Sequence, residues 1–146
     1  MEAVILVGVQ GAGKSAFYRD RFFDTHVRIN LDMLRTRKRE QQLLTACLEA
    51  GQSFVVDNTN PQASDRAKYI EAARAKGFRV IAYFFDVPLR DAMHRNNQRK
   101  LRQKIPPAAV AGTHKKLEPP SKNEGFDQIF TVRVTGPTGF VVTEGA

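Results

Sequence analysis

The eight residues from Gly8 to Ser15 constrain this chain more than any other feature. They read Gly-Val-Gln-Gly-Ala-Gly-Lys-Ser, follow an apolar run at residues 3–7 and precede a segment with a helical pattern. A strand, a glycine-rich turn and a helix in this order are typical of a P-loop. The glycines let successive backbone N–H groups point at one anion, and the helix adds its positive N-terminal end. The chain is therefore predicted to bind a nucleoside triphosphate.

The spacing of the P-loop also assigns roles to its residues. The residues expected to surround the phosphates with their backbone are Gly8, Gly11, Ala12 and Gly13. Lys14 is expected to reach the β- and γ-phosphates, and the Ser15 hydroxyl to bind Mg2+. ATP and Mg2+ are thus the expected cofactors. The alternative is a glycine-rich turn followed by a surface lysine.

Apolar runs alternate with helical patterns from residue 3 to about residue 134, which is typical of a parallel sheet wrapped by helices. Strands are predicted at residues 3–7, 27–30, 53–57, 79–85 and 128–134. Helices are predicted at residues 14–23, 37–50, 61–76 and 88–102, with a short helix after Pro106 and Pro107. Asn60 is expected to cap the third helix and Pro61 to open it. The predicted fold is an α/β, P-loop NTPase-like (adenylate-kinase-like) sheet, mostly parallel, with about five strands flanked by helices.

Length and composition narrow the class of protein. The 146 residues predict one P-loop kinase domain over residues 1–146, with no room for a second catalytic domain. The segment 135–146 is expected to be a turn plus a short extended tail, to which the sequence assigns no role. The single cysteine, Cys47, excludes an internal disulfide and suits a reducing compartment. The sequence shows no signal or membrane span, so a soluble cytoplasmic protein is expected.

The formal net charge of +8 favours polyanionic partners, either a nucleotide or a nucleic acid strand. A solvated basic face that only aids solubility has the same composition, so charge alone does not decide between these readings.

In open parallel sheets, ligands bind beyond the carboxyl ends of the strands. Asp57 ends an apolar strand and is expected to hold Mg2+ directly or through water, the alternative being an Asx cap for the next helix. Asp32 follows the second strand, with Arg35 three residues on. A carboxylate there can accept the proton of an attacking hydroxyl, and a guanidinium can bind a phosphate of the acceptor. A surface ion pair or a helix N-cap remains the alternative.

Residues 93–106 are expected to form a lid. Arg95, Arg99 and Arg102 recur at three- and four-residue steps, so a helix would present them as one cationic stripe over the triphosphate. The alternative is an exposed basic helix. His94 is expected to be a packing or surface residue.

Together these motifs resemble the 5′-hydroxyl polynucleotide kinase family, the kinase module of phage and animal end-healing enzymes. The resemblance covers about Ile5 to Phe130. Its motifs are the P-loop, the Asp-x-x-Arg element from Asp32, and the segments 55–61, 95–99 and 105–126. Family members often carry an appended phosphatase, ligase or phosphodiesterase domain, and these residues contain none, so a separate 3′-phosphatase or ligase partner is expected.

The resemblance implies roles for individual residues. Lys14 and Ser15 would serve ATP and Mg2+, and Asp32 would be the general base toward the 5′-hydroxyl. Arg35 would hold the phosphate on the 3′ side of the terminal nucleotide. Arg99, helped by Arg95, would contact the transferring phosphoryl group. The residues placed in the metal and acceptor region are Asp57 and Thr59.

The expected activity is transfer of the ATP γ-phosphate to the 5′-hydroxyl of DNA or RNA. The first rival is a small-molecule P-loop kinase acting on a sugar, nucleoside or antibiotic. The second rival is an ATP-gated binding module without catalysis. The sequence does not choose between DNA and RNA, and it leaves the oligomeric state open.

Overall fold

The structure is a computed structural model that describes residues 1–99, 104–136 and 139–145. Its centre is a six-stranded sheet in the order β2-β3-β1-β4-β5-β6. The first five strands are parallel, and β6 pairs antiparallel with β5. The strands are β1 Glu2–Val7, β2 Val27–Ile29, β3 Phe54–Val56, β4 Arg79–Phe85, β5 Gln128–Thr135 and β6 Gly139–Glu144.

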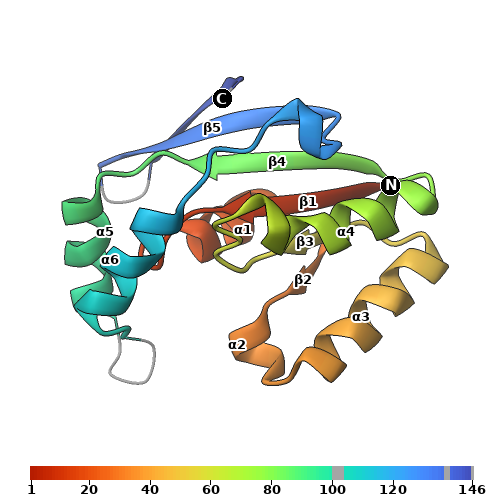
Figure 1. The fold of residues 1–146 in the computed structure, drawn as a ribbon, viewed down its shortest axis with the longest axis horizontal. Coiled ribbons are helices and arrows are strands. Elements are labelled where there is room, and N and C mark those ends of the chain that lie inside the picture. Colours follow the sequence, from red (N-terminus) through yellow and green to blue (C-terminus); the bar gives the residue numbers. More distant parts are fainter. Residues whose placement is uncertain (100–103, 137–138, 146) are drawn as a thin grey trace.

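Helices cover both faces of this sheet (Figure 1). They are α1 Lys14–Arg21, α2 Leu31–Leu34, α3 Arg37–Ala50, α4 Ala63–Ala75, α5 Leu89–Asn97 and α6 Pro107–Lys116, with a 3-10 turn η2 at Lys122–Glu124. Leu44 of α3 and Tyr69 of α4 belong to the core on one face. Phe17 of α1, Ala92 of α5 and Val110 of α6 belong to the core on the other face. Because both faces are covered, the central strands β3, β1 and β4 are apolar almost throughout, and the predicted α/β fold is confirmed.

The sheet has one strand more than the about five that were predicted, because the extended segment of the tail pairs with β5 as a sixth strand. Phe140 of β6 packs against Phe17 of α1, with the ring centroids 5.2 Å apart. This contact and the pairing with β5 give the tail a structural role that its sequence did not reveal.

The start of α4 also differs from its prediction. Gln62 is the N-cap, and its backbone N–H donates to the Asp65 side chain at 3.0 Å. Asn60 is buried and has a φ of 45°, and its Nδ2 donates to the carbonyl oxygen of Leu6 at 2.9 Å. Asn60 therefore joins the loop after β3 to β1 instead of capping a helix.

The predicted helix over 88–102 ends early, at Asn97. Arg99 follows in a turn in which its backbone N–H donates to the carbonyl oxygen of Asn96 at 3.1 Å. Arg102 lies outside the described residues, so the predicted three-arginine stripe is described only in part.

The carboxyl ends of the parallel strands lie at one edge of the sheet, where α2, α5 and α6 gather (Figure 1). The P-loop follows β1, α2 follows β2, and the loop from Asp57 follows β3. The sheet thus brings the predicted chemical groups to a common edge. No helix among the described residues is long and apolar enough to cross a membrane.

Candidate active site

The P-loop has the backbone geometry that its glycines predict. Gly11 and Gly13 have φ values of 80° and 101°, a region that L side chains rarely adopt. A Cβ atom on Gly11 would lie 2.3 Å from the carbonyl oxygen of Ala92, so α5 packs directly on the loop. On the other side, the backbone N–H of Gly8 donates to the carbonyl oxygen of Thr59 at 3.0 Å. The loop is therefore held between α5 and the segment that follows β3.

Lys14 lies inside this loop and is only 9% exposed. Its Nζ donates to the carbonyl oxygens of Gly8 and Val9 at 2.9 and 2.8 Å. Burial lowers the pKa of Lys14 to about 8. The ammonium group is thus desolvated and rests on two neutral acceptors, an arrangement that a phosphate anion would stabilise.

Three charged side chains act on the pKa of Lys14 in addition to its burial. Asp57 and Asp32 raise this pKa, and Arg99 lowers it, with Asp57 giving the largest of the three effects. The structure therefore brings the predicted metal-region carboxylate, base and lid arginine into electrostatic range of one lysine. They come from three different segments of the chain.

Asp57 is buried beside Ser15, where it accepts two hydrogen bonds on the same oxygen. The Ser15 hydroxyl donates to Asp57 Oδ2 at 2.9 Å, and Arg28 Nε donates to it at 2.8 Å. Arg28 Nη2 also donates to Ser15 Oγ at 3.0 Å, which closes a triangle. Since Gln62 caps α4, the Asx-cap alternative for Asp57 is wrong. A hydroxyl and a carboxylate oxygen at this spacing are ligands that suit a hard divalent cation.

Asp32 is exposed on the single turn of α2, which is fixed by two asparagines. Asn30 caps the turn by accepting from Met33 N at 2.9 Å, and its Nδ2 donates to the carbonyl oxygen of Asp57 at 2.5 Å. Asn58 Oδ1 accepts from Leu31 N at 2.9 Å. The N-cap alternative for Asp32 is therefore wrong, because Asn30 fills that role.

Arg35 ends the same turn with a φ of 78° and is exposed. Among the ion pairs that the described residues form, none joins Asp32 to Arg35. The alternative interpretation, a surface ion pair between Asp32 and Arg35, is therefore not supported by the described residues. Contact of Arg35 with an acceptor phosphate stays a prediction.

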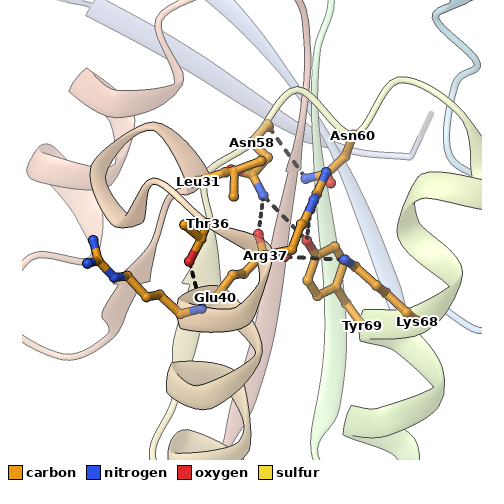
Figure 2. A network of polar contacts seen from close by, with 9 residues as sticks. Leu31, Thr36, Arg37, Glu40, Asn58, Asn60, Lys68 and Tyr69 are labelled. Atoms are coloured by element: carbon orange, nitrogen blue, oxygen red, sulfur yellow. Dashed lines mark hydrogen bonds and ion pairs between the residues drawn. The ribbon is translucent and has the colours of Figure 1, made fainter.

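A buried carboxylate supports this turn from below (Figure 2). Glu40 of α3 is 2% exposed and accepts from Asn58 Nδ2 and Arg37 Nη1, both at 2.9 Å, and from Lys68 Nζ at 3.2 Å. Burial alone would raise the pKa of Glu40, but these hydrogen bonds outweigh it and lower the pKa. Asn58 therefore links the Glu40 carboxylate to the backbone of Leu31, the residue before Asp32.

Sequence reasoning missed Arg28, Glu40 and the role of Asn58. Arg28 lies between two apolar residues of a strand, and this position is the local signal that could have identified it as a residue of the site. Glu40 was not singled out, because two of its three charged or amide partners, Asn58 and Lys68, lie 18 and 28 residues away.

The segment after β4 brings Arg95 to the P-loop. A Cβ atom on Gly13 would lie 2.9 Å from Arg95 Nη1. Asn96 is fully buried, and its side chain pairs with both the N–H and the carbonyl oxygen of Ile105, at 3.0 and 2.6 Å. Hydrogen bonds between Asn96 and Ile105 thus connect the start and the end of the predicted lid, next to the P-loop.

A pocket of about 800 Å³ opens beside Arg95. Gln98, Arg133 and Val134 also line it, and Val134 lies within 3.6 Å of a Cβ placed on Gly13. The pocket therefore extends outward from the P-loop between α5 and the end of β5.

Comparison with known proteins identifies the family of this chain. A family described as "AAA domain" matches residues 4–120. The "Putative bifunctional polynucleotide phosphatase/kinase" of Acanthamoeba polyphaga mimivirus is 30% identical over 138 residues, covering 90% of this chain and 33% of that protein. The "Bifunctional polynucleotide phosphatase/kinase" of Schizosaccharomyces pombe is 27% identical over 141 residues, covering 88% of this chain and 32% of that protein. The chain spans about a third of the length of the curated relatives it matches.

Among solved structures, a gluconokinase from Sinorhizobium meliloti 1021 superposes with a TM-score of 0.62 at 19% identity. The match covers 94% of this chain and 85% of that one, and it shows a common fold. The relatives confirm the resemblance to polynucleotide kinases. Since the family match spans the P-loop, the turn of Asp32 and Arg95, the chain belongs to this AAA-domain family and has the fold of P-loop kinases.

Proposed function

We propose that this kinase transfers the γ-phosphoryl group of ATP to the 5′-hydroxyl of a DNA or RNA strand. The observation that carries the proposal is the placement of Asp32. Its carboxylate is exposed to solvent on a fixed turn, yet it lies within electrostatic range of the buried Lys14 in the P-loop. An acceptor entering from solvent can therefore meet a base and a triphosphate in one place.

The donor side of the site is supported by the P-loop and its neighbours. The backbone N–H groups from Gly11 to Gly13 and the ammonium of Lys14 would bind the phosphates. Arg95 lies against Gly13, so we place the nucleotide base in the pocket that this arginine borders. Arg99 would add positive charge near the transferring group.

The residues of the Ser15 region fit a magnesium ion, because a hydroxyl and a carboxylate supply hard oxygen ligands. When bound, Mg2+ would neutralise charge on the β- and γ-phosphates. Ser15 and Asp57 would hold it, Asp57 directly or through water.

On the acceptor side, Asp32 would take the proton of the attacking 5′-hydroxyl. Arg35, three residues later, would bind the next phosphate of the strand with its planar guanidinium. Thr59 would contact the acceptor from the loop after β3, where its carbonyl oxygen already accepts from Gly8. The net charge of +8 favours a strand over a neutral metabolite.

The names of the relatives join a phosphatase to a kinase, and we assign this chain to the kinase part because it carries the P-loop. We propose that a 3′-phosphatase or ligase acting on the same ends lies outside these 146 residues.

The test is incubation with labelled ATP and a 5′-hydroxyl oligonucleotide of DNA or RNA, beside a panel of sugars and nucleosides. Label should enter the oligonucleotide. Asp32→Asn should lower kcat by at least about 100-fold, the size of a general-base contribution, while ATP binding changes by less than about twofold. Asp24→Asn removes an exposed carboxylate in the turn after α1 and should leave the rate unchanged.

Three outcomes would contradict the proposal or the role of Asp32 in it. Label that enters a metabolite and no oligonucleotide would favour a small-molecule kinase. Nucleotide binding without transfer to any hydroxyl would favour an ATP-gated binding module. Full activity of Asp32→Asn would remove Asp32 from the mechanism even if oligonucleotides are phosphorylated.

A further inference from the structure

Arg28 of β2 is a charge held beside the P-loop that the phosphoryl-transfer scheme does not use. Its Nε donates to Asp57 Oδ2 at 2.8 Å, and its Nη2 donates to Ser15 Oγ at 3.0 Å. These are the two oxygens assigned above to the divalent cation. The guanidinium therefore lies on the same ligands that the metal would use.

Asp57 needs a positive partner because its side chain is only 1% exposed. An ionised carboxylate in such a place is stable only when it is paired and hydrogen-bonded. Arg28 supplies that charge, and the Ser15 hydroxyl supplies a second hydrogen bond to the same oxygen. The guanidinium thus keeps both oxygens in place before a metal ion arrives.

A bound metal ion changes this balance. A Mg2+ ion on Ser15 Oγ and near Asp57 would stand beside a guanidinium that bonds to the same atoms, and the two cations would repel each other. The Arg28 side chain is 28% exposed, whereas that of Asp57 is nearly buried. Arg28 is therefore the partner that can move into solvent, and Asp57 is the partner that stays.

We propose that Arg28 is a built-in counter-ion of the metal site, which holds Ser15 and Asp57 in the empty protein and is displaced by the divalent cation. The proposal rests on the metal assignment of the proposed function, but not on the acceptor. Competition with Arg28 would weaken metal binding in the absence of nucleotide and so favour entry of the metal together with the triphosphate, whose negative charge offsets the repulsion.

The experiment compares wild type with Arg28→Gln, which keeps polar reach and removes the charge. Binding of Mn2+ alone is measured by electron paramagnetic resonance, without nucleotide or acceptor. Arg28→Gln should bind Mn2+ at least about tenfold more tightly, because a neighbouring positive charge is gone. Its melting temperature should fall in EDTA and recover with Mg2+, whereas that of wild type should respond little to Mg2+.

Arg21→Gln is the matched control, because Arg21 pairs with Asp20 on the surface, with 45% and 60% of the two side chains exposed. It removes the same charge away from the site and should leave Mn2+ binding unchanged. Adding Asp57→Asn to Arg28→Gln should abolish the gain in Mn2+ affinity. A purely structural ion pair would lower stability in Arg28→Gln without any gain in metal affinity.

A measurement on wild type covers the case in which Arg28→Gln does not fold. The Nε–H resonance of Arg28, held by Asp57, should be visible by 15N NMR in EDTA and should shift or disappear on adding Mg2+ with ADP. Equal or weaker Mn2+ binding by Arg28→Gln, or an Nε–H resonance unchanged by Mg2+ with ADP, would overturn the proposal. Because neither readout involves an acceptor, failure to phosphorylate oligonucleotides would leave this inference standing.

Discussion

The lowered pKa of Lys14 makes nucleotide binding depend on pH in a direction that can be calculated. In the free protein, burial lowers this pKa to about 8. A bound triphosphate stabilises the charged form and raises the pKa of Lys14 toward its ordinary value. Binding is therefore linked to proton uptake. The affinity for ATP is at its full value well below pH 8 and falls as the pH rises through 8.

The size of the effect follows from the fraction of Lys14 that is charged. That fraction falls from about nine-tenths at pH 7 to about one-tenth at pH 9 for a pKa of about 8. If Lys14 stays charged in the complex, the Kd for ATP should rise about tenfold between these pH values. This corresponds to about 1.4 kcal/mol of binding free energy.

Isothermal titration calorimetry at pH 7, 8 and 9, in buffers of different ionisation enthalpy, measures both the Kd and the protons taken up. Uptake should reach about 0.5 proton per ATP at pH 8. Lys14→Arg keeps a positive charge at every pH used, so its remaining affinity should not vary over this range. A wild-type Kd that stays constant from pH 7 to pH 9, without proton uptake, would refute the reasoning.

Three further predictions concern the loop, its support and the acceptor side. Gly11→Ala should lower the free energy of unfolding by at least about 2 kcal/mol more than Gly77→Ala in urea titrations, because both glycines have positive φ but only Gly11 would meet another backbone; equal losses would contradict this packing. Glu40→Gln should cost about 2–4 kcal/mol at pH 7. Since the pKa of Glu40 is lowered in the folded protein, that difference should shrink as the pH falls through this pKa; a constant difference would show that the charge of Glu40 contributes nothing. Arg35→Ala should raise the KM for the oligonucleotide about tenfold and leave the KM for ATP unchanged, measured by initial rates; an unchanged oligonucleotide KM would argue against the phosphate contact.

Much of the fold follows from local chemistry along the chain. The nearly unbroken apolar runs at β3 and β4 predicted buried parallel strands, and α3 has the bounds that its pattern indicated. The errors arose where a distant partner overrides a local preference. Asn60 has the sequence signature of a cap, but its amide donates to Leu6, 54 residues away, and Gln62 caps the helix. The tail forms β6 because it pairs with β5 and because Phe140 packs against Phe17 of α1.

The candidate site divides in the same way. Its P-loop and the carboxylates of Asp32 and Asp57 could be predicted, because a strand end in a parallel sheet has a known place and the motif has a fixed spacing. The roles of those side chains in transfer stay predictions. Arg28 and Glu40 could not be predicted, because neither belongs to a motif and each acts through residues far away in the chain.

The sequence by itself determined that this chain builds a P-loop on a parallel sheet and carries acidic groups to its edge, since glycine spacing and strand patterning are properties of short segments. Only the tertiary structure decided which charges meet there. A buried carboxylate is stable only beside a cation within hydrogen-bond distance, and the fold determines which cation lies there. For Asp57 that cation is Arg28, 29 residues away on the strand next to β3.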